Sequence, residues 1–119
     1  YDKNAQIIVV TGDGSLELNI QELKTVSQNN LNIKIFVINN GGYASIRESQ
    51  DAYSDGRYTE AEDILDFSKV ADAFEMNYEI IDDFNNLDNQ ILSITSHPHP
   101  MLVEVVCERE QKIFEPEKL

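Results

Sequence analysis

The stretch IIVVTGDGSLELNIQEL (residues 7–23) decides the fold of this chain. Its first part is β-branched and apolar, and its second part places Leu16, Ile20 and Leu23 at the spacing of an amphipathic helix. Between them stands Gly-Asp-Gly-Ser, in which glycine supplies turn conformations and aspartate can cap its own backbone. The stretch therefore predicts a strand over residues 5–10 that is buried on both faces, a glycine-rich turn, and a helix.

Composition and charge exclude several classes of protein. The formal net charge is −13, from 22 acidic and 9 basic residues, so the basic stripe that nucleic-acid binding needs is lacking. No apolar run is long enough to cross a membrane, and no signal-peptide pattern opens the chain. Cys107 is the single cysteine, which excludes an internal disulfide and favours a reducing, cytoplasmic location. The 119 residues form one predicted domain, and a first residue that is tyrosine rather than methionine suggests a piece of a larger chain.

The remaining elements alternate along the chain. Further strands are predicted over residues 33–38, 77–81 and 101–106, and helices over residues 66–74 and 84–96. Residues 43–63 are polar and are predicted as a long loop. The alternation predicts an α/β fold, an open parallel sheet with helices on both faces.

Two glycine-rich turns are expected to meet at one edge of this sheet. TGDGS follows the first strand and NNGG follows the second, and the carboxyl ends of parallel strands share an edge. Asp13 and the pair Asn39-Asn40 thereby provide carboxylate and amide oxygens, which suit Mg²⁺. Gly14 and Ser15 open the helix, where free N–H groups can face a phosphate.

Alternatives remain open at this point, because each motif alone is weak. Gly-Asp-Gly-Ser can be a plain turn, and Asn-Asn-Gly-Gly a plain strand exit. In that interpretation the chain is a non-catalytic α/β binding module. A receiver-like domain is disfavoured because its phospho-accepting aspartate and lysine are not evident, and neither a Walker lysine nor GxGxxG is present.

The sequence resembles a known enzyme family. GDGS, the helix LNIQEL and the strand NIKIFVINN resemble the cofactor motif of thiamine-diphosphate enzymes, which runs from GDG to NN over a similar interval. GDGSLELNIQELKTV, DFSKVADAF and PMLVEVVC resemble the acetolactate synthase group. The likeness covers residues 5 to about 110 and implies the C-terminal, diphosphate-binding portion of a larger enzyme acting on 2-oxo acids.

The resemblance also implies roles for individual residues. Mg²⁺ would be bound by Asp13, the Asn40 side chain and the Gly42 carbonyl. The thiamine diphosphate would be contacted by Gly12, Asp13, Gly14, Ser15, Asn40, Gly42, Tyr43 and Ala44. The activating glutamate is expected outside this chain, on a pyrimidine-binding domain of the same or a neighbouring subunit, in a homo-oligomer. No catalytic residue is therefore assigned within residues 1–119.

Two departures from the acetolactate synthase pattern bear on the substrate. Ser49 stands where branched-chain acetolactate synthases usually carry a tryptophan, and the ending IFEPEKL lacks their proline-rich tail. Together they disfavour a branched-chain biosynthetic role and predict little preference for 2-oxobutyrate over pyruvate as second substrate.

Other polar residues receive simpler interpretations. HPHP (residues 97–100) is predicted to be a solvated connector. Arg47 and Gln50 follow the site closely and could contact a substrate, although a surface salt bridge is the preferred interpretation. Glu17 and Glu22 are expected to face solvent or to support the helix. Tyr53, Arg57 and Tyr58 lie in the long predicted loop, as a lid or as ordinary surface.

Overall fold

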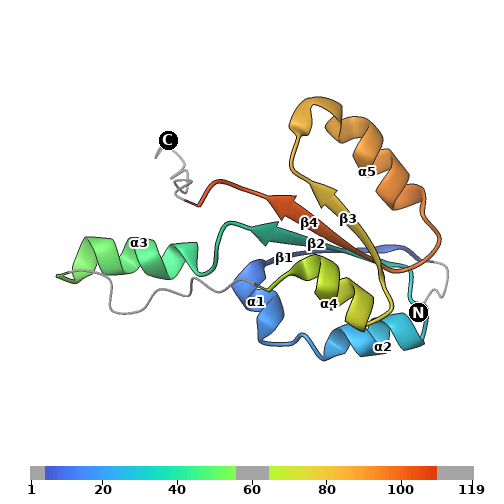
Figure 1. Ribbon diagram of the computed structural model, residues 1–119, viewed down its shortest axis with the longest axis horizontal. Coiled ribbons are helices and arrows are strands. Elements are labelled where there is room, and N and C mark those ends of the chain that lie inside the picture. Colours follow the sequence, from blue (N-terminus) through green and yellow to red (C-terminus); the bar gives the residue numbers. More distant parts are fainter. Residues whose placement is uncertain (1–4, 56–64, 110–119) are drawn as a thin grey trace.

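The computed structural model describes residues 5–55 and 65–109 and contains a parallel four-stranded sheet (Figure 1). Its strands are β1 (Ile7–Gly12), β2 (Ile33–Asn39), β3 (Asn77–Ile81) and β4 (Met101–Val106). They stand in the order β1-β2-β4-β3, and each neighbouring pair is parallel. The predicted α/β fold with an open parallel sheet is confirmed.

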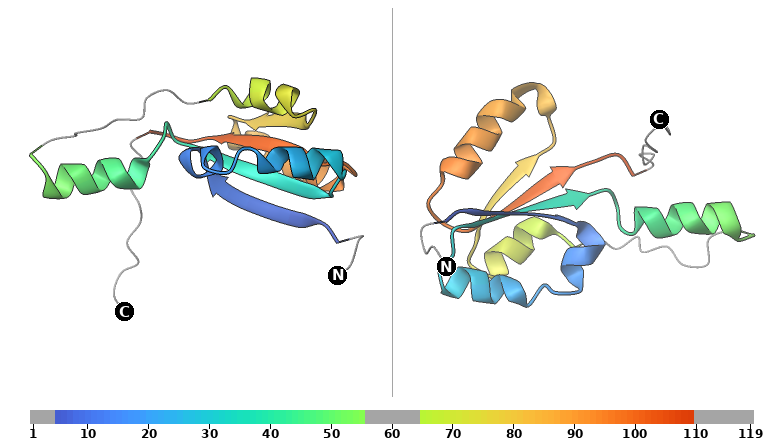
Figure 2. Two further views of the ribbon diagram at one scale, coloured as in Figure 1. Left: turned by 90° about the horizontal axis from the view of Figure 1, so that it is seen from below. Right: turned by 180° about the vertical axis from the view of Figure 1, so that it is seen from behind.

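Helices cover both faces of this sheet (Figures 1 and 2). One face is covered by α1 (Asp13–Glu17), α2 (Glu22–Gln28) and α4 (Phe67–Ala73). The other is covered by α5 (Leu87–Ser96), which follows a short 3₁₀ helix, η1 (Phe84–Asn86). Asp66 caps α4, because its Oδ1 accepts from the Lys69 amide at 3.2 Å.

Each face has its own hydrophobic core. The larger cluster joins β2 and β4 to the three helices and contains Leu16, Leu23, Val26, Ile35, Val37, Phe67, Ala71, Met76 and Leu102. The smaller cluster lies under α5 and contains Phe36, Ile81, Ile94, Met101 and Val103. Alternating residues of β2 enter opposite clusters, as the two-residue period of a strand requires.

The prediction that the first strand is buried on both faces is wrong. β1 lies at the edge of the described sheet, with only β2 beside it. Ile8 and Val10 share a face with Phe36 but lie beyond the reach of α5, and they are 47% and 67% exposed. The apolar run of β1 thus identified a strand correctly, but what lies beside that strand depends on the tertiary arrangement.

The helix predicted after the glycines is interrupted. α1 and α2 are separated by residues 18–21, where the amides of Asn19 and Glu22 bond to carbonyls three residues earlier. Such bonds tighten the chain relative to an α-helix and redirect α2 along the sheet. The interruption leaves Leu18 70% exposed.

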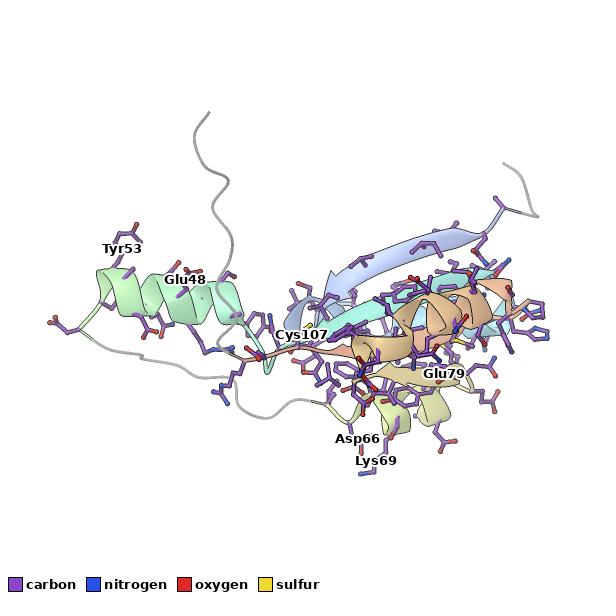
Figure 3. The ribbon with its side chains drawn as sticks, turned by 90° about the horizontal axis from the view of Figure 1, so that it is seen from above. Glu48, Tyr53, Asp66, Lys69, Glu79 and Cys107 are labelled. Atoms are coloured by element: carbon purple, nitrogen blue, oxygen red, sulfur yellow. The ribbon has the colours of Figure 1, made fainter. Side chains whose placement is uncertain are left out.

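A helix also replaces part of the predicted loop. α3 (Ala44–Tyr53) follows the turn after β2 and projects away from the sheet beyond the carboxyl ends of the strands (Figure 1). Figure 3 shows Glu48 and Tyr53 on this projecting part, and Tyr53 is 90% exposed. The sequence did not predict this helix because its apolar periodicity is weak. The one side chain that α3 buries is the charged side chain of Arg47. Arg57 and Tyr58 lie outside the described residues.

At the amino ends of the strands, a buried lysine anchors the HPHP segment through a hydrogen bond. Lys34 is fully buried, and its Nζ donates to Asn32 Oδ1 and to the His99 carbonyl, both at 2.7 Å. Burial lowers the pKa of Lys34. The side chain of His99 is exposed, as a connector predicts, but its backbone is anchored. None of the described helices is long and apolar enough to cross a membrane.

Candidate functional site

Asp13 lies at the centre of the candidate site. It follows Gly12 at the end of β1 and begins α1, and it is only 3% exposed. Its Oδ1 accepts from the Gly14 amide at 2.8 Å, and its Oδ2 accepts from the Gly42 amide at 2.7 Å. The second bond joins the two glycine-rich turns, so the structure brings them together as expected.

The turn after β2, the Asn39–Tyr43 loop, has a conformation that depends on its glycines. Gly41 and Gly42 have φ angles of 81° and 102°, in the region that side chains other than glycine rarely adopt. Asn39 Oδ1 accepts from the Gly41 amide at 3.3 Å, and the Asn39 carbonyl accepts from the Cys107 amide at 2.8 Å. The loop is therefore fixed to the segment that follows β4.

The side-chain oxygen of Asn40, Oδ1, is unusual because it is buried without a hydrogen-bond partner. Buried polar atoms are nearly always paired, and an unpaired acceptor costs about 1–3 kcal/mol. A side-chain amide oxygen without a partner, in the same loop that bonds to Asp13, is the arrangement expected of a ligand to a hard cation.

Tyr43 packs directly against Gly14. A Cβ added at Gly14 would lie 2.7 Å from atoms of the tyrosine ring, so the close approach requires glycine. The Tyr43 hydroxyl donates to the Gly14 carbonyl at 3.1 Å. This contact holds the first turn of α1 against the Asn39–Tyr43 loop.

The other predicted cofactor residues border the same place. Gly12 is the N-cap of α1, and Ser15 is exposed in its first turn, where amides have no intrahelical acceptor. The Ala44 amide donates to the Gly42 carbonyl at 2.9 Å as α3 begins. All the predicted site residues thus lie on the two turns, at the carboxyl edge of β1 and β2.

The structure adds Glu104, which sequence reasoning missed. Its Oε1 accepts from Asn39 Nδ2 at 2.6 Å, and its Oε2 accepts from the Tyr78 hydroxyl at 2.5 Å. Burial, with the Glu104 hydrogen bond second, raises the pKa of Tyr78 well above its usual value. Glu104 is the only charged residue in the strand MLVEVV, a signal that could have identified it.

Arg47 and Cys107 also border the site. Arg47 is 4% exposed, and its guanidinium donates to the carbonyls of Gly41, Asn40 and Arg109, so the predicted surface position is wrong. Cys107 is half-buried near the base of α3 (Figure 3). Burial, and secondly the negative charge of Asp13, raises the pKa of its thiol.

The donors at this edge favour one kind of metal site. Within residues 5–55 and 65–109, no three histidine, cysteine, aspartate or glutamate side chains are grouped so that they could hold a metal ion. A carboxylate, an amide oxygen and backbone carbonyls remain, a set suited to Mg²⁺ with water and a ligand phosphate completing its octahedron.

Comparison with known proteins identifies the family of this chain. Residues 1–105 match the family described as "Thiamine pyrophosphate enzyme, C-terminal TPP binding domain". The chain is 33% identical over 114 residues to the acetolactate synthase large subunit of Cyanidium caldarium, covering 93% of this chain and 20% of that protein. It is 31% identical over 113 residues to the isozyme 1 large subunit of Escherichia coli, covering 92% and 20%.

The fold is also shared with solved structures. Benzoylformate decarboxylase from Polynucleobacter necessarius superimposes with a TM-score of 0.81 at 18% identity, over 93% of this chain and 21% of that one. The chain therefore spans about a fifth of the length of the curated and solved proteins that it matches.

Proposed function

Because this chain belongs to the thiamine pyrophosphate enzyme family, as its C-terminal TPP-binding domain, we propose that it holds the diphosphate and Mg²⁺ of the cofactor in an enzyme acting on 2-oxo acids. The reaction class would be decarboxylation or carboligation, as the likeness to acetolactate synthases suggests. Residues 1–119 would be the cofactor-binding portion of a longer protein.

The buried, unpartnered Oδ1 of Asn40 carries the proposal. If Gly-Asp-Gly-Ser were only a turn, the fold would gain nothing from an open acceptor at this place, and a nonpolar residue there would be more favourable. A Mg²⁺ ion would supply the missing partner. The bond from the Gly42 amide to Asp13 brings the carboxylate to the same loop.

The proposed roles follow from this arrangement. Asp13, the Asn40 side chain and the Gly42 carbonyl would bind Mg²⁺, and the Gly42 oxygen keeps a second lone pair beside its bond from the Ala44 amide. The diphosphate would be contacted by Gly12, Gly14, Ser15, Tyr43 and Ala44. Gly14 suits this role because it lets the chain approach closely, and Ser15 because its amide lies in the first turn of α1.

The chain's own contribution is to bind and orient the cofactor. Thiamine diphosphate, when bound, supplies the carbon nucleophile and the electron sink for loss of CO₂. Within the described residues, Glu17 and Glu22 lie along α1 and α2 and are proposed to have no role in proton transfer. That role would belong to a pyrimidine-binding domain, which pairs with this kind of domain in oligomeric enzymes.

The test compares Asn40→Ala with the unaltered chain. Mn²⁺ replaces Mg²⁺, because the same oxygen ligands suit both ions and Mn²⁺ broadens nearby NMR signals. With thiamine diphosphate present, we expect broadening of the amide signals of Gly14 and Gly42 in the unaltered chain and its loss in Asn40→Ala. The thermal midpoint of Asn40→Ala should not fall, because Oδ1 has no partner to lose.

Asn89→Ala is the matched control, since Asn89 is exposed on α5 on the far side of the sheet. It should bind as the unaltered chain does. If the unaltered chain shows no cofactor-dependent broadening at these glycines, either alone or with a pyrimidine-binding domain added, the alternative of a plain turn is correct. If Asn40→Ala binds equally well, Asn40 is not a metal ligand.

A further inference from the structure

The Asn39–Tyr43 loop cannot hold its shape by itself. Its two consecutive glycines have positive φ angles, and glycine loses more conformational freedom on folding than any other residue. Its conformation must therefore be stabilised by groups outside the loop. Asp13 provides one such group, at the Gly42 amide.

Glu104 and the Cys107 amide hold Asn39 at the start of the loop, and Arg47 holds the residues that follow it. From the first half of α3, Arg47 turns back onto the loop, and its guanidinium donates to the Gly41 carbonyl at 2.8 Å and the Asn40 carbonyl at 3.1 Å. The same side chain donates to the Arg109 carbonyl at 2.9 Å, beyond β4. A guanidinium is always charged, so its burial to 4% exposure is tolerable only with such hydrogen bonds.

These contacts divide the oxygens of the loop into those that accept a hydrogen bond from Arg47 and those that do not. The carbonyls of Asn40 and Gly41 accept from Arg47, whereas Oδ1 of Asn40 remains without a partner. We propose that Arg47 is a positioning residue, which holds the Asn39–Tyr43 loop so that the Asn40 amide oxygen and the Gly42 carbonyl stay available for Mg²⁺. This inference rests on the proposed function, but its effect on the loop itself can be measured without any ligand.

The position of α3 supports this role. The helix projects away from the sheet (Figure 1). Its one buried side chain is that of Arg47. Replacing Arg47 therefore leaves both hydrophobic clusters intact, so a variant that loosens the loop should remain folded.

The first experiment measures hydrogen exchange of the Gly41 and Gly42 amides without cofactor. In Arg47→Met we expect both amides to exchange at least about tenfold faster, because charge-assisted hydrogen bonds that fix the loop are lost. Arg47→Lys should give a smaller acceleration, since lysine keeps the charge but not the fork of donors. Lys24→Met, which removes an exposed cation on α2, should change neither amide.

The second experiment compares Mg²⁺ with Ca²⁺, each with thiamine diphosphate, by calorimetry on the same variants. Mg²⁺ demands near-ideal octahedral geometry, whereas Ca²⁺ tolerates irregular sites. Arg47→Met should weaken Mg²⁺ binding about tenfold and Ca²⁺ binding distinctly less, and Arg47→Lys should restore part of the Mg²⁺ preference. A merely structural role would lower the fraction of competent protein without changing this ratio.

The two experiments have separable outcomes. Faster loop exchange with a reduced Mg²⁺ preference supports the inference. Unchanged exchange at Gly41 and Gly42, or an unchanged metal ratio in Arg47→Met, overturns it. If the unaltered chain binds neither metal, the proposed function fails and the metal-positioning role fails with it, while the exchange data still establish whether Arg47 fixes the loop.

Discussion

Asp13 shows how a single residue can serve both the fold and the proposed site. Its carboxylate accepts two backbone amides, one from its own turn and one from the Asn39–Tyr43 loop. A carboxylate oxygen can accept more than one bond, so these contacts leave room for a metal ion. Replacing Asp13 must therefore affect stability as well as binding, which separates it from Asn40.

Asp13→Asn should abolish Mg²⁺-dependent binding of thiamine diphosphate. It removes the carboxylate that bonds to both turns, and metal binding depends on ligand charge. It should also lower the free energy of unfolding by about 1–3 kcal/mol, because a hydrogen bond to a charged acceptor is weakened or lost. Calorimetric titration and urea denaturation measure the two effects. Asp88→Asn, at an exposed position of α5, is the control, and retained binding in Asp13→Asn would exclude Asp13 as a ligand.

Cys107 should react slowly with iodoacetamide. Burial and the nearby charge of Asp13 both raise the pKa of its thiol, so less of the nucleophilic thiolate exists at any given pH. The reaction rate, followed by mass spectrometry at about pH 8, should be lower than that of an unstructured peptide thiol, whose pKa is about 8.5. Equal rates would mean that the thiol is neither buried nor influenced by Asp13. Urea should remove the difference, because unfolding exposes the thiol.

Among the elements, β4 connects the sheet to the site. Met101, Leu102 and Val103 are buried, and Glu104 interrupts this apolar run halfway along the strand. Its carboxylate joins Tyr78 of β3 to Asn39 at the end of β2. A charged residue in a central strand is thereby paired on both of its oxygens, as burial of charge requires.

Tyr78 should make the stability of the chain fall at high pH. Burial first, and the bond to Glu104 second, raises the pKa of the folded phenol, whereas the unfolded phenol titrates near pH 10. The folded state favours the neutral phenol, so its contribution to stability is complete below about pH 10 and is lost as the pH rises further. Urea denaturation at several pH values should show a smaller decline in Tyr78→Phe. An identical decline in both proteins would contradict the coupling.

Across the whole molecule, β1 is the least buried strand of the described sheet. Ile7, Ile8, Val9 and Val10 are 37–67% exposed, although their sequence is that of a buried strand. On the helical face, Val9 lines an apolar pocket with Leu16, Leu23, Val26 and Ile35. On the other face, α5 covers β3 and β4 but does not reach β1. An exposed apolar edge strand promotes self-association.

Threonine substitutions on the bare face of β1 should reduce this association. Ile8→Thr with Val10→Thr keeps β-branched side chains in the strand and removes apolar surface that is already half in water. Light scattering should show less association at high concentration, while the thermal midpoint changes little. Val103→Thr, at a fully buried position, should instead destabilise the fold strongly. Unchanged association in the double variant would show that β1 is not the surface responsible.

The chain by itself should release no CO₂ from pyruvate, even with saturating thiamine diphosphate and Mg²⁺. Proton transfer requires hydrogen-bond reach, about 3 Å or one water molecule, and the activating glutamate is proposed to lie on another domain. Turnover on adding a pyrimidine-binding domain in trans would agree with this division of roles. Clear decarboxylation by residues 1–119 alone would mean that the base lies within them.

The sequence by itself determined the elements that follow from local periodicity. The apolar runs over residues 33–38, 77–81 and 101–106 predicted β2, β3 and β4, and their alternation with helices predicted the parallel sheet. Parallel topology then placed TGDGS and NNGG at one edge, because strands in such a sheet end on the same side. The family could be predicted from these two motifs together with the segments LNIQEL, DFSKVADAF and PMLVEVVC, and the candidate site residues followed from that resemblance.

Only the tertiary structure decided the features that depend on what lies beside a residue. The sequence could not tell that β1 is exposed, that the helix after it is interrupted, or that Arg47 is buried under the Asn39–Tyr43 loop. Periodicity reports which side chains share a face, but the covering of that face is set by packing between distant segments. For the same reason the partners of Glu104 and the open oxygen of Asn40 became visible only once β2, β3 and β4 lay side by side.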